Sequence, residues 1–133
     1  MADLAPNRIA PLIPAAYAIH LLDERFVPPG IPAWATTVAD MPFSNEAWRA
    51  INLPSLVLVS VAALLVARPN RPHWMLLILA GHIGLHGIGH LLGSIAFGVL
   101  SPGVVTGLVF CVPTAVLAFL VGAKGMSPLQ PER

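Results

Sequence analysis

Charge is the property that this sequence has least of. Asp, Glu, Lys and Arg make up only 10% of its 133 residues, whereas 56% are hydrophobic. A soluble domain usually has about 25% charged residues, so a water-soluble protein of this size would have too little polar surface to cover itself. We therefore predict an integral membrane protein that forms a single domain over residues 1–133.

The sequence also has little net positive charge and little cysteine. Seven basic residues face six acidic ones, for a net charge of +1, so we expect no basic surface that would bind a nucleic acid. Cys111 is the only cysteine, which excludes an intrachain disulfide and a cysteine-rich zinc site. Because Cys111 lies in an apolar run, we interpret it as a small packing residue.

Long apolar segments are what the sequence has instead. Four of them, at about residues 9–27, 48–67, 74–99 and 103–123, approach or exceed the roughly 20 residues that cross a bilayer. They predict an all-α fold, an integral membrane four-helix bundle, followed by a flexible tail over 124–133. The first segment is the least apolar, because Asp23, Glu24 and Arg25 each cost about 2.5–3.5 kcal/mol at the membrane centre. These charges must therefore lie off-centre, be neutralised or have partners.

Basic residues indicate how the segments are oriented. With four spans, five basic residues share the side of the two termini: Arg8, Arg68, Arg71, Lys124 and Arg133. Only Arg25 and Arg49 fall on the other side, so the positive-inside rule places both termini in the cytoplasm. The connection over 28–47 then lies outside, and Ser44 is a predicted N-cap of the second helix. A cleaved signal peptide is the alternative for the first segment, since AAYA at 15–18 offers a small-residue cleavage pattern.

Six polar residues inside these segments fall at nearly one depth. Counted from the cytoplasmic side at 1.5 Å per residue, they lie about 18–24 Å deep: His20, Asp23, Glu24, Asn52, His86 and His90. Residues three or four apart also share a helix face, as His20 does with Glu24 and His86 with His90. Ionisable groups in membrane segments are costly and indicate function by default. We therefore predict a polar site, built by three helices, in the outer half of the bilayer.

The third segment, which begins near Trp74, carries a further histidine and several glycines. His82 lies only about 12 Å deep, and we interpret it as a packing residue. Gly89 with Gly93, and Ala80 with Gly84, form small-xxx-small pairs that allow helices to approach closely in a bilayer. After this segment, we expect Pro102 and Gly103 to form a turn.

The residue types in the polar layer favour a metal site. Imidazole and carboxylate groups are ligands for zinc, iron and manganese. We predict that four residues bind such a divalent metal ion: His20, Glu24, His86 and His90. The predicted catalytic residues are Asp23, Glu24 and Asn52, with Asp23 either completing the ligand set or accepting an imidazole N–H. An open position on the metal would then act on an apolar or lipid-like molecule that arrives from the bilayer.

Other functions stay open on the same residues. Without a metal, a carboxylate facing an imidazole forms an acid/base pair suited to an isomerase, cyclase or hydratase of an apolar substrate. Polar groups at one level also occur in proton or ion pathways, although here they do not continue through the membrane. A haem between histidines and a structural membrane partner protein are the remaining alternatives. We also expect a homo-oligomer, because four short helices shield few polar groups from lipid.

Short motifs follow one another along most of the chain, from His20 to Val121: HLLDE at 20–24, RAIN at 49–52, a histidine-bearing third segment and SPGVVTGLVFCVP at 101–113. In order and spacing they resemble the HXXEE family of small bacterial membrane proteins. The resemblance implies the bacterial inner membrane but no reaction, because the family has no settled function. Two positions depart from the family's H-x-x-E-E and Y-x-P-G motifs. Asp23 stands at the first glutamate, and Leu100 stands at the tyrosine.

Overall fold

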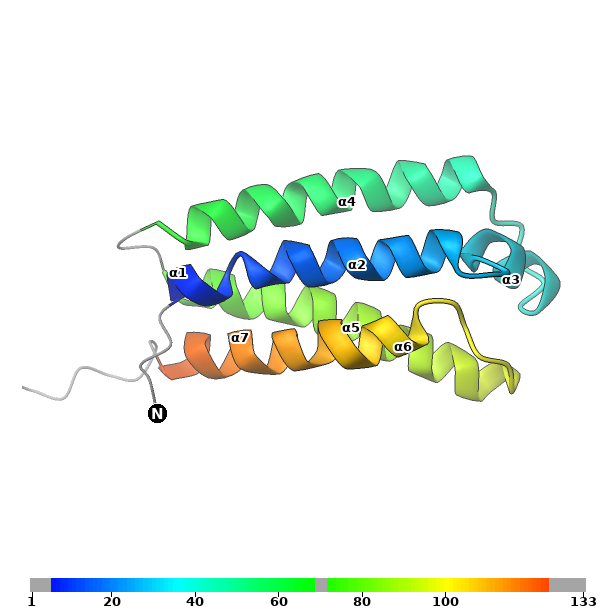
Figure 1. Cartoon of the computed structure of the whole chain (residues 1–133). Coiled ribbons are helices and arrows are strands. Elements are labelled where there is room, and N and C mark those ends of the chain that lie inside the picture. The colour runs from blue at the N-terminus through cyan, green and yellow to red at the C-terminus, as the bar shows by residue number, and fades with distance from the viewer. Residues whose placement is uncertain (1–5, 69–71, 125–133) are drawn as a thin grey trace, which may run out of the picture.

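A computed structural model describes residues 6–68 and 72–124, and all the regular structure in these ranges is helical. The elements in chain order are α1 (Pro6–Ile9), α2 (Leu12–Phe26), α3 (Ile31–Thr37), α4 (Asn45–Val66), α5 (Trp74–Phe97), α6 (Val104–Thr106), the π-helix η1 (Gly107–Cys111) and α7 (Val112–Lys124). Figure 1 shows α2, α4, α5 and the continuous α6–η1–α7 segment running side by side, with α3 at one end. The predicted all-α fold is confirmed.

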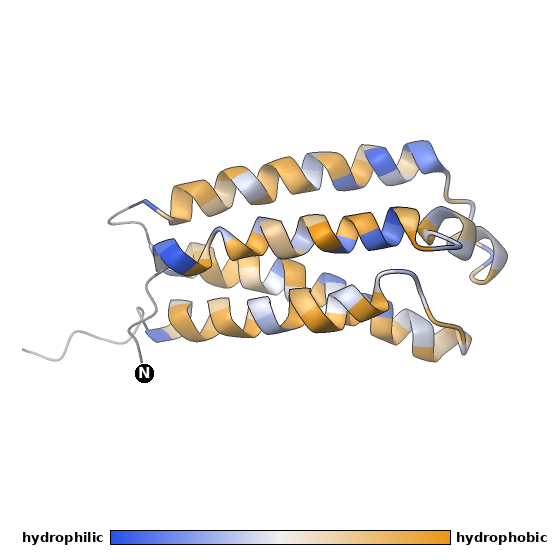
Figure 2. Ribbon diagram, in the orientation of Figure 1, coloured by the Kyte–Doolittle hydropathy of each residue, from blue (hydrophilic) through white to orange (hydrophobic). Residues whose placement is uncertain are grey.

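Within residues 6–68 and 72–124, three helices are long and apolar enough to cross a membrane: Asn45–Val66, Trp74–Phe97 and Val104–Lys124. In Figure 2 they are mostly hydrophobic along their length, and hydrophilic residues gather toward helix ends. The predicted first span is not among these three. Its helix is interrupted between Ile9 and Leu12, where Pro11 precedes α2, and proline has no backbone N–H to continue a helix. The remaining α2 has only 15 residues, short of the roughly 20 that a span requires.

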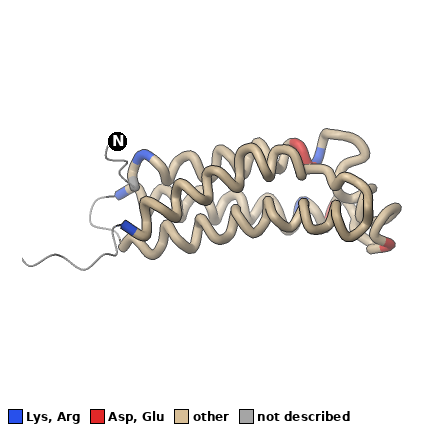
Figure 3. The backbone as a smooth tube through the Cα atoms, turned by 90° about the horizontal axis from the view of Figure 1, so that it is seen from below, with Lys and Arg blue, Asp and Glu red and all other residues tan. Residues whose placement is uncertain are grey.

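The first and last described helices meet at one end of the molecule. α1 packs against α7. Figure 3 shows Lys and Arg residues at this end; Asp and Glu lie toward the other end, where basic residues are also visible. The basic residues include Arg8 in α1 and Lys124 at the end of α7. The predicted flexible tail lies outside the described residues, apart from Lys124 itself.

The connection between the first two long helices contains a short helix that was not predicted. It contains α3, which begins after Gly30 in a left-handed conformation (φ 75°) that favours glycine. Trp34 of α3 is buried and packs edge-on against Phe97, with ring centroids 5.5 Å apart. Ser44 caps α4 as predicted, because its side chain accepts a hydrogen bond from the Ala47 backbone N–H at 3.1 Å.

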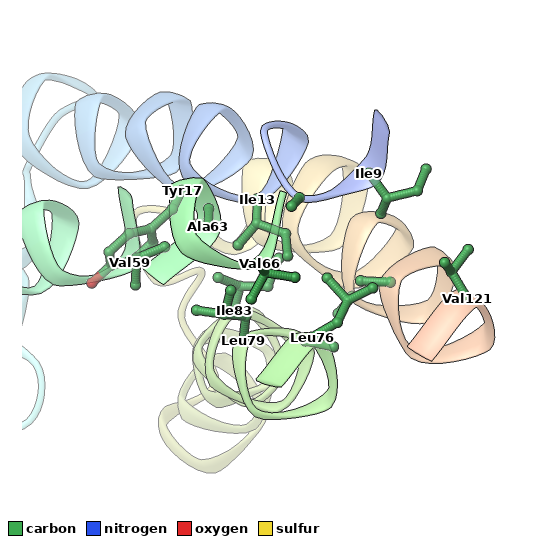
Figure 4. Packing of buried hydrophobic residues seen from close by; sticks show 14 of the residues in the cluster. Ile9, Ile13, Tyr17, Val59, Ala63, Val66, Leu76, Leu79, Ile83 and Val121 are labelled. Carbon is green, nitrogen blue, oxygen red and sulfur yellow. The ribbon is translucent and has the colours of Figure 1, made fainter. Parts of the chain in front are cut away.

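The hydrophobic core lies in the half of the molecule near α1. In Figure 4, Ile13 of α2 points toward Leu79 and Ile83 of α5. Tyr17 lies beside Val59 of α4, and Ile9 lies on the side of Val121 of α7. The Ile13 and Ile83 side chains are fully buried. This core holds α2, α4 and α5 together and thereby sets the positions of the polar residues at the other end.

Close helix packing uses one of the predicted glycines and one that was not predicted. Gly84 approaches Ala115, as expected for the Ala80–Gly84 pair, since a Cβ on Gly84 would meet the Ala115 Cβ at 3.0 Å. The second contact is at Gly87, where a Cβ would lie 2.9 Å from the Gly107 carbonyl oxygen. The predicted packing role of Gly89 is wrong: a Cβ there meets nothing within 4 Å, because Gly89 lies on the outer face of α5. Cys111 is buried and free, in agreement with a packing role.

Candidate metal site

Four side chains from two helices converge in the half of the molecule opposite α1. Their ligand atoms all lie within 4.8 Å of one another, and the group consists of His20, Glu24, His86 and His90. Each helix supplies a pair of residues four apart, on α2 and on α5, so one face of each helix is directed at the other. This group is the complete set of metal ligands predicted from the sequence.

One carboxylate oxygen is the centre of the cluster. Glu24 Oε1 lies 2.7 Å from His90 Nε2, 2.9 Å from His86 Nε2 and 3.2 Å from His20 Nε2. His20 and Glu24 are buried, whereas the His86 side chain is 26% exposed and that of His90 is 11% exposed. The cluster is therefore closed on the α2 side and accessible only along α5.

The second carboxylate oxygen of Glu24 is held by α4. Trp48 Nε1 donates a hydrogen bond of 2.8 Å to Glu24 Oε2, and the Trp48 side chain is itself buried. This bond fixes the carboxylate plane and satisfies the oxygen that faces away from the histidines. The Glu24 side chain thus has partners on both oxygens, as a buried charge requires.

A hydroxyl group orients the imidazole of His20. His20 Nδ1 lies 3.0 Å from Thr106 Oγ1, and the same hydroxyl donates to Asp23 Oδ2 at 2.6 Å. A threonine hydroxyl has a single proton to donate, and here it goes to the carboxylate. His20 Nδ1 must then be the donor toward Thr106, so Asp23 acts on His20 through Thr106 and not as a ligand.

A second hydroxyl orients His90 in a similar way. His90 Nδ1 lies 2.9 Å from Ser101 Oγ, which donates to the Pro102 carbonyl oxygen at 3.1 Å. Ser101 is in turn fixed by its backbone N–H, which donates to Ser94 Oγ at 2.8 Å. Imidazoles that ligate metals usually donate their other N–H to an oxygen in this manner.

These hydrogen bonds leave a positive charge missing at the centre. With its proton on Nδ1, neutral His20 has a lone pair on Nε2, and this buried atom has no hydrogen-bond partner among the described residues. It nevertheless faces the Glu24 carboxylate at 3.2 Å. Two electron-rich atoms in a buried site repel each other unless a proton on Nε2 or a metal ion lies between them. The cluster therefore needs a positive charge at this point, which either a protonated His20 or a bound metal ion would supply.

The turn before α6 brings backbone directly onto the cluster. Gly103 has φ 88°, and a Cβ at this position would lie 2.7 Å from His20 Cε1 and 3.0 Å from Glu24 Cγ. Only glycine satisfies both the conformation and the approach. The predicted turn at Pro102 and Gly103 is thus confirmed, and the structure adds that its glycine covers the histidines.

A π-helical turn positions Thr106 and Gly107 next to this glycine. The Val112 N–H bonds to the Gly107 carbonyl oxygen, five residues earlier. Pro113 follows directly, and proline disrupts the regular four-residue pattern because it lacks an N–H. Single π-turns of this kind are frequent at functional sites. Here the turn coincides with the contact between Gly107 and Gly87.

Two of the polar residues considered from the sequence stand apart from the cluster. Asn52 is buried, accepts a hydrogen bond from the Tyr17 hydroxyl at 3.3 Å and donates to the Trp48 carbonyl oxygen. His82 packs edge-on against Tyr17, with ring centroids 5.5 Å apart, and does not reach Glu24. Asn52 thus reaches the cluster only indirectly, through Trp48 and through Tyr17, which packs edge-on against His86, and its catalytic role stays a prediction.

Three residues that contact the predicted ligands were not predicted as site residues: Trp48, Ser101 and Thr106. Trp48 gave no specific signal because tryptophan is common at membrane interfaces. A lone serine or threonine is likewise common at the start of a helix. A sequence signal does exist for the last two, because Ser101 and Thr106 flank the Pro102–Gly103 turn.

Comparison with known proteins gives one match. The family described as "Protein of unknown function with HXXEE motif" matches residues 11–118, a range that includes every residue of the cluster. No curated protein and no solved structure matches the chain.

Proposed function

Because this chain belongs to the HXXEE family, whose function is unknown, we propose a function from the site itself. We propose that it is a small membrane enzyme that uses a divalent metal ion, held by the three histidines and Glu24, to act on an apolar or lipid-like substrate. The single observation that carries this proposal is the convergence of three imidazole Nε2 atoms on Glu24 Oε1.

The spacing of these atoms suits a metal ion. Ligands at about 2.0–2.2 Å from a tetrahedral ion lie about 3.3–3.6 Å from one another. The three separations from Glu24 Oε1 are 2.7–3.2 Å, and all four ligand atoms lie within 4.8 Å of one another, so small side-chain movements would bring them to these values. A cation at this point also resolves the repulsion between His20 Nε2 and the carboxylate.

The ligand types restrict both the metal and the chemistry. Three imidazoles and one carboxylate suit zinc, iron or manganese, whereas magnesium and calcium prefer oxygen ligands. Asp23 and Thr106 support this set by fixing the His20 tautomer, as an outer hydrogen-bond shell does in metalloenzymes. A metal of this kind activates water or dioxygen beside a bound substrate, so hydrolysis or oxygen-dependent oxidation of apolar molecules is the reaction class that we propose.

We further propose that α1 and α2 are embedded as a fourth membrane segment. α2 packs against α4 and α5, and its outward face carries exposed apolar side chains at Ile19, Leu22 and Phe26. Such a face is stable in lipid and costly in water. With the positive-inside rule, the α1 end then lies in the cytoplasm of a bacterial cell, and the cluster lies in the outer half of the inner membrane.

Elemental analysis of detergent-purified protein by plasma mass spectrometry tests the metal site. We expect about one zinc, iron or manganese ion per chain in the wild type, and loss of that ion in Glu24→Gln and His86→Ala. His82→Ala is the matched control, since His82 lies one turn from His86 on α5 but does not contact Glu24. It should retain the metal.

A folded wild type that binds none of the three metals, even after incubation with each, would refute the metal proposal. In that case the short contacts of His86 and His90 with Glu24 Oε1 favour the metal-free acid/base function. Loss of metal in the control His82→Ala, as well as in Glu24→Gln and His86→Ala, would also count against this ligand set.

A further inference from the structure

A groove on the surface of α5 leads to the exposed edge of the cluster. It has a volume of about 330 Å³, within the size range of small-molecule binding pockets. His86 and His90 line it, together with Trp34 and Ile31 of α3 and the outward-facing Gly89 and Gly93 of α5. We call this the α3–α5 groove.

Accessibility makes this groove the route to the metal ligands. His20 is fully buried and the Glu24 side chain is 3% exposed, whereas the His86 side chain is 26% exposed. The neighbouring outer residues of α5, Leu85 and Leu92, are apolar and exposed, so the groove opens onto the surface that faces lipid. A molecule dissolved in the bilayer thus reaches the histidines without passing through water.

The glycines in the groove have no packing function that explains them. Gly89 meets no atom within 4 Å when a Cβ is added, and Gly93 meets only the Trp34 ring, at 3.6 Å. In the middle of a helix each glycine is about 1 kcal/mol less favourable than alanine. Their effect here is to leave a shallow floor between the Trp34 wall and the two histidines.

We infer that the α3–α5 groove binds the substrate, and that this substrate is a membrane amphiphile with an alkyl chain and an oxygen-bearing end. The chain lies over Gly89 and Gly93 against Trp34, and the oxygen-bearing end faces His86 and His90. This inference rests on the proposed function, because a metal ion held by the histidines would bind that oxygen. The apolar walls select for the chain, and the two imidazoles place the polar end.

The test uses alkyl hydroxamates as probes, because a hydroxamate head binds metal ions and its chain length can be varied. Protein loaded with Co²⁺ is titrated with octanohydroxamate and with acetohydroxamate, and binding is followed by the visible absorption of the metal. We expect the wild type to bind octanohydroxamate at least tenfold more tightly than acetohydroxamate. Gly89→Leu should fill the groove and abolish this preference while the Co²⁺ spectrum without ligand is unchanged.

Gly81→Leu is the matched control. Gly81 lies on the same helix, also has nothing within 4 Å of an added Cβ, and lines a different apolar groove of about 350 Å³ that contains no histidine. Gly81→Leu should keep the wild-type preference for the longer chain. Because the probes partition into detergent equally with both variants, the comparison also controls for that partitioning. A chain-length preference that is missing from the wild type, or that survives in Gly89→Leu, overturns the inference. Absence of any Co²⁺ spectrum instead refutes the proposed metal site on which it rests.

Discussion

Glu24 uses both of its carboxylate oxygens, and for that reason the residues around it are restricted. Oε1 faces three imidazoles and Oε2 accepts from Trp48, so the carboxylate has no freedom to rotate. Two of the histidines, His20 and His90, are in turn fixed by hydroxyl groups on the other side of their rings, at Thr106 and Ser101. Glu24 and these two histidines are therefore already oriented, which would lower the entropic cost of binding the proposed metal.

The Thr106 hydroxyl gives the first test at this scale. Thr106→Val keeps the size and the branched shape of the side chain but removes the link between His20 Nδ1 and Asp23 Oδ2. We expect metal affinity to fall about 10–100-fold, as is typical when an outer hydrogen-bond partner is lost, with little change in helix content. Competition with a chelator measures the affinity. Thr114→Val on α7 is the control and should bind metal as the wild type does; equal affinities in both variants would show that Thr106 does not orient His20.

At the scale of the element, a comparison of Gly103 with Gly98 distinguishes the effect of backbone strain from the effect of damage to the site. Gly98 and Gly103 both have positive φ angles, 64° and 88°, but an added Cβ meets nothing at Gly98 and meets His20 Cε1 at 2.7 Å at Gly103. Alanine in the left-handed region costs about 1–2 kcal/mol. Gly98→Ala should therefore lower the thermal unfolding temperature but keep the metal, whereas Gly103→Ala should lose the metal as well. Full metal content in folded Gly103→Ala would contradict the close contact.

The elements also show what the sequence allowed to be predicted. The convergence of the four clustered residues was predictable, because residues four apart share a face of one helix, as His20 and Glu24 do on α2. The depth in the membrane that was estimated from the sequence placed those two residues at the level of His86 and His90. The Thr106 contact was not predictable in this way, since it depends on the π-turn that rotates the start of the last helix. Asn52 shows the limit of the depth argument: it is buried at a neighbouring level, but its side chain turns toward Tyr17.

Considered as a whole, the molecule is asymmetric along its helices. The hydrophobic core lies mostly toward the α1 end, where Arg8 and Lys124 also lie. The cluster and its groove lie toward the other end, where Trp34 of α3 lines the groove. Hydrophobic packing at the α1 end thus holds the helices together, and the polar cluster lies at the opposite end. If the basic end faces the cytoplasm, the groove opens toward the outer leaflet, which determines the lipids that can reach it.

Cysteine labelling in intact cells tests that orientation. Thr37 in α3 and Arg68 after α4 are both exposed and lie at opposite ends of the molecule. A membrane-impermeant maleimide should label Thr37→Cys in intact bacterial cells and Arg68→Cys only after the cells are opened. The natural Cys111 gives no background because it is fully buried, which the wild type verifies. The reverse pattern would leave the cluster intact but place the groove in the cytoplasmic leaflet, because every helix would turn over together.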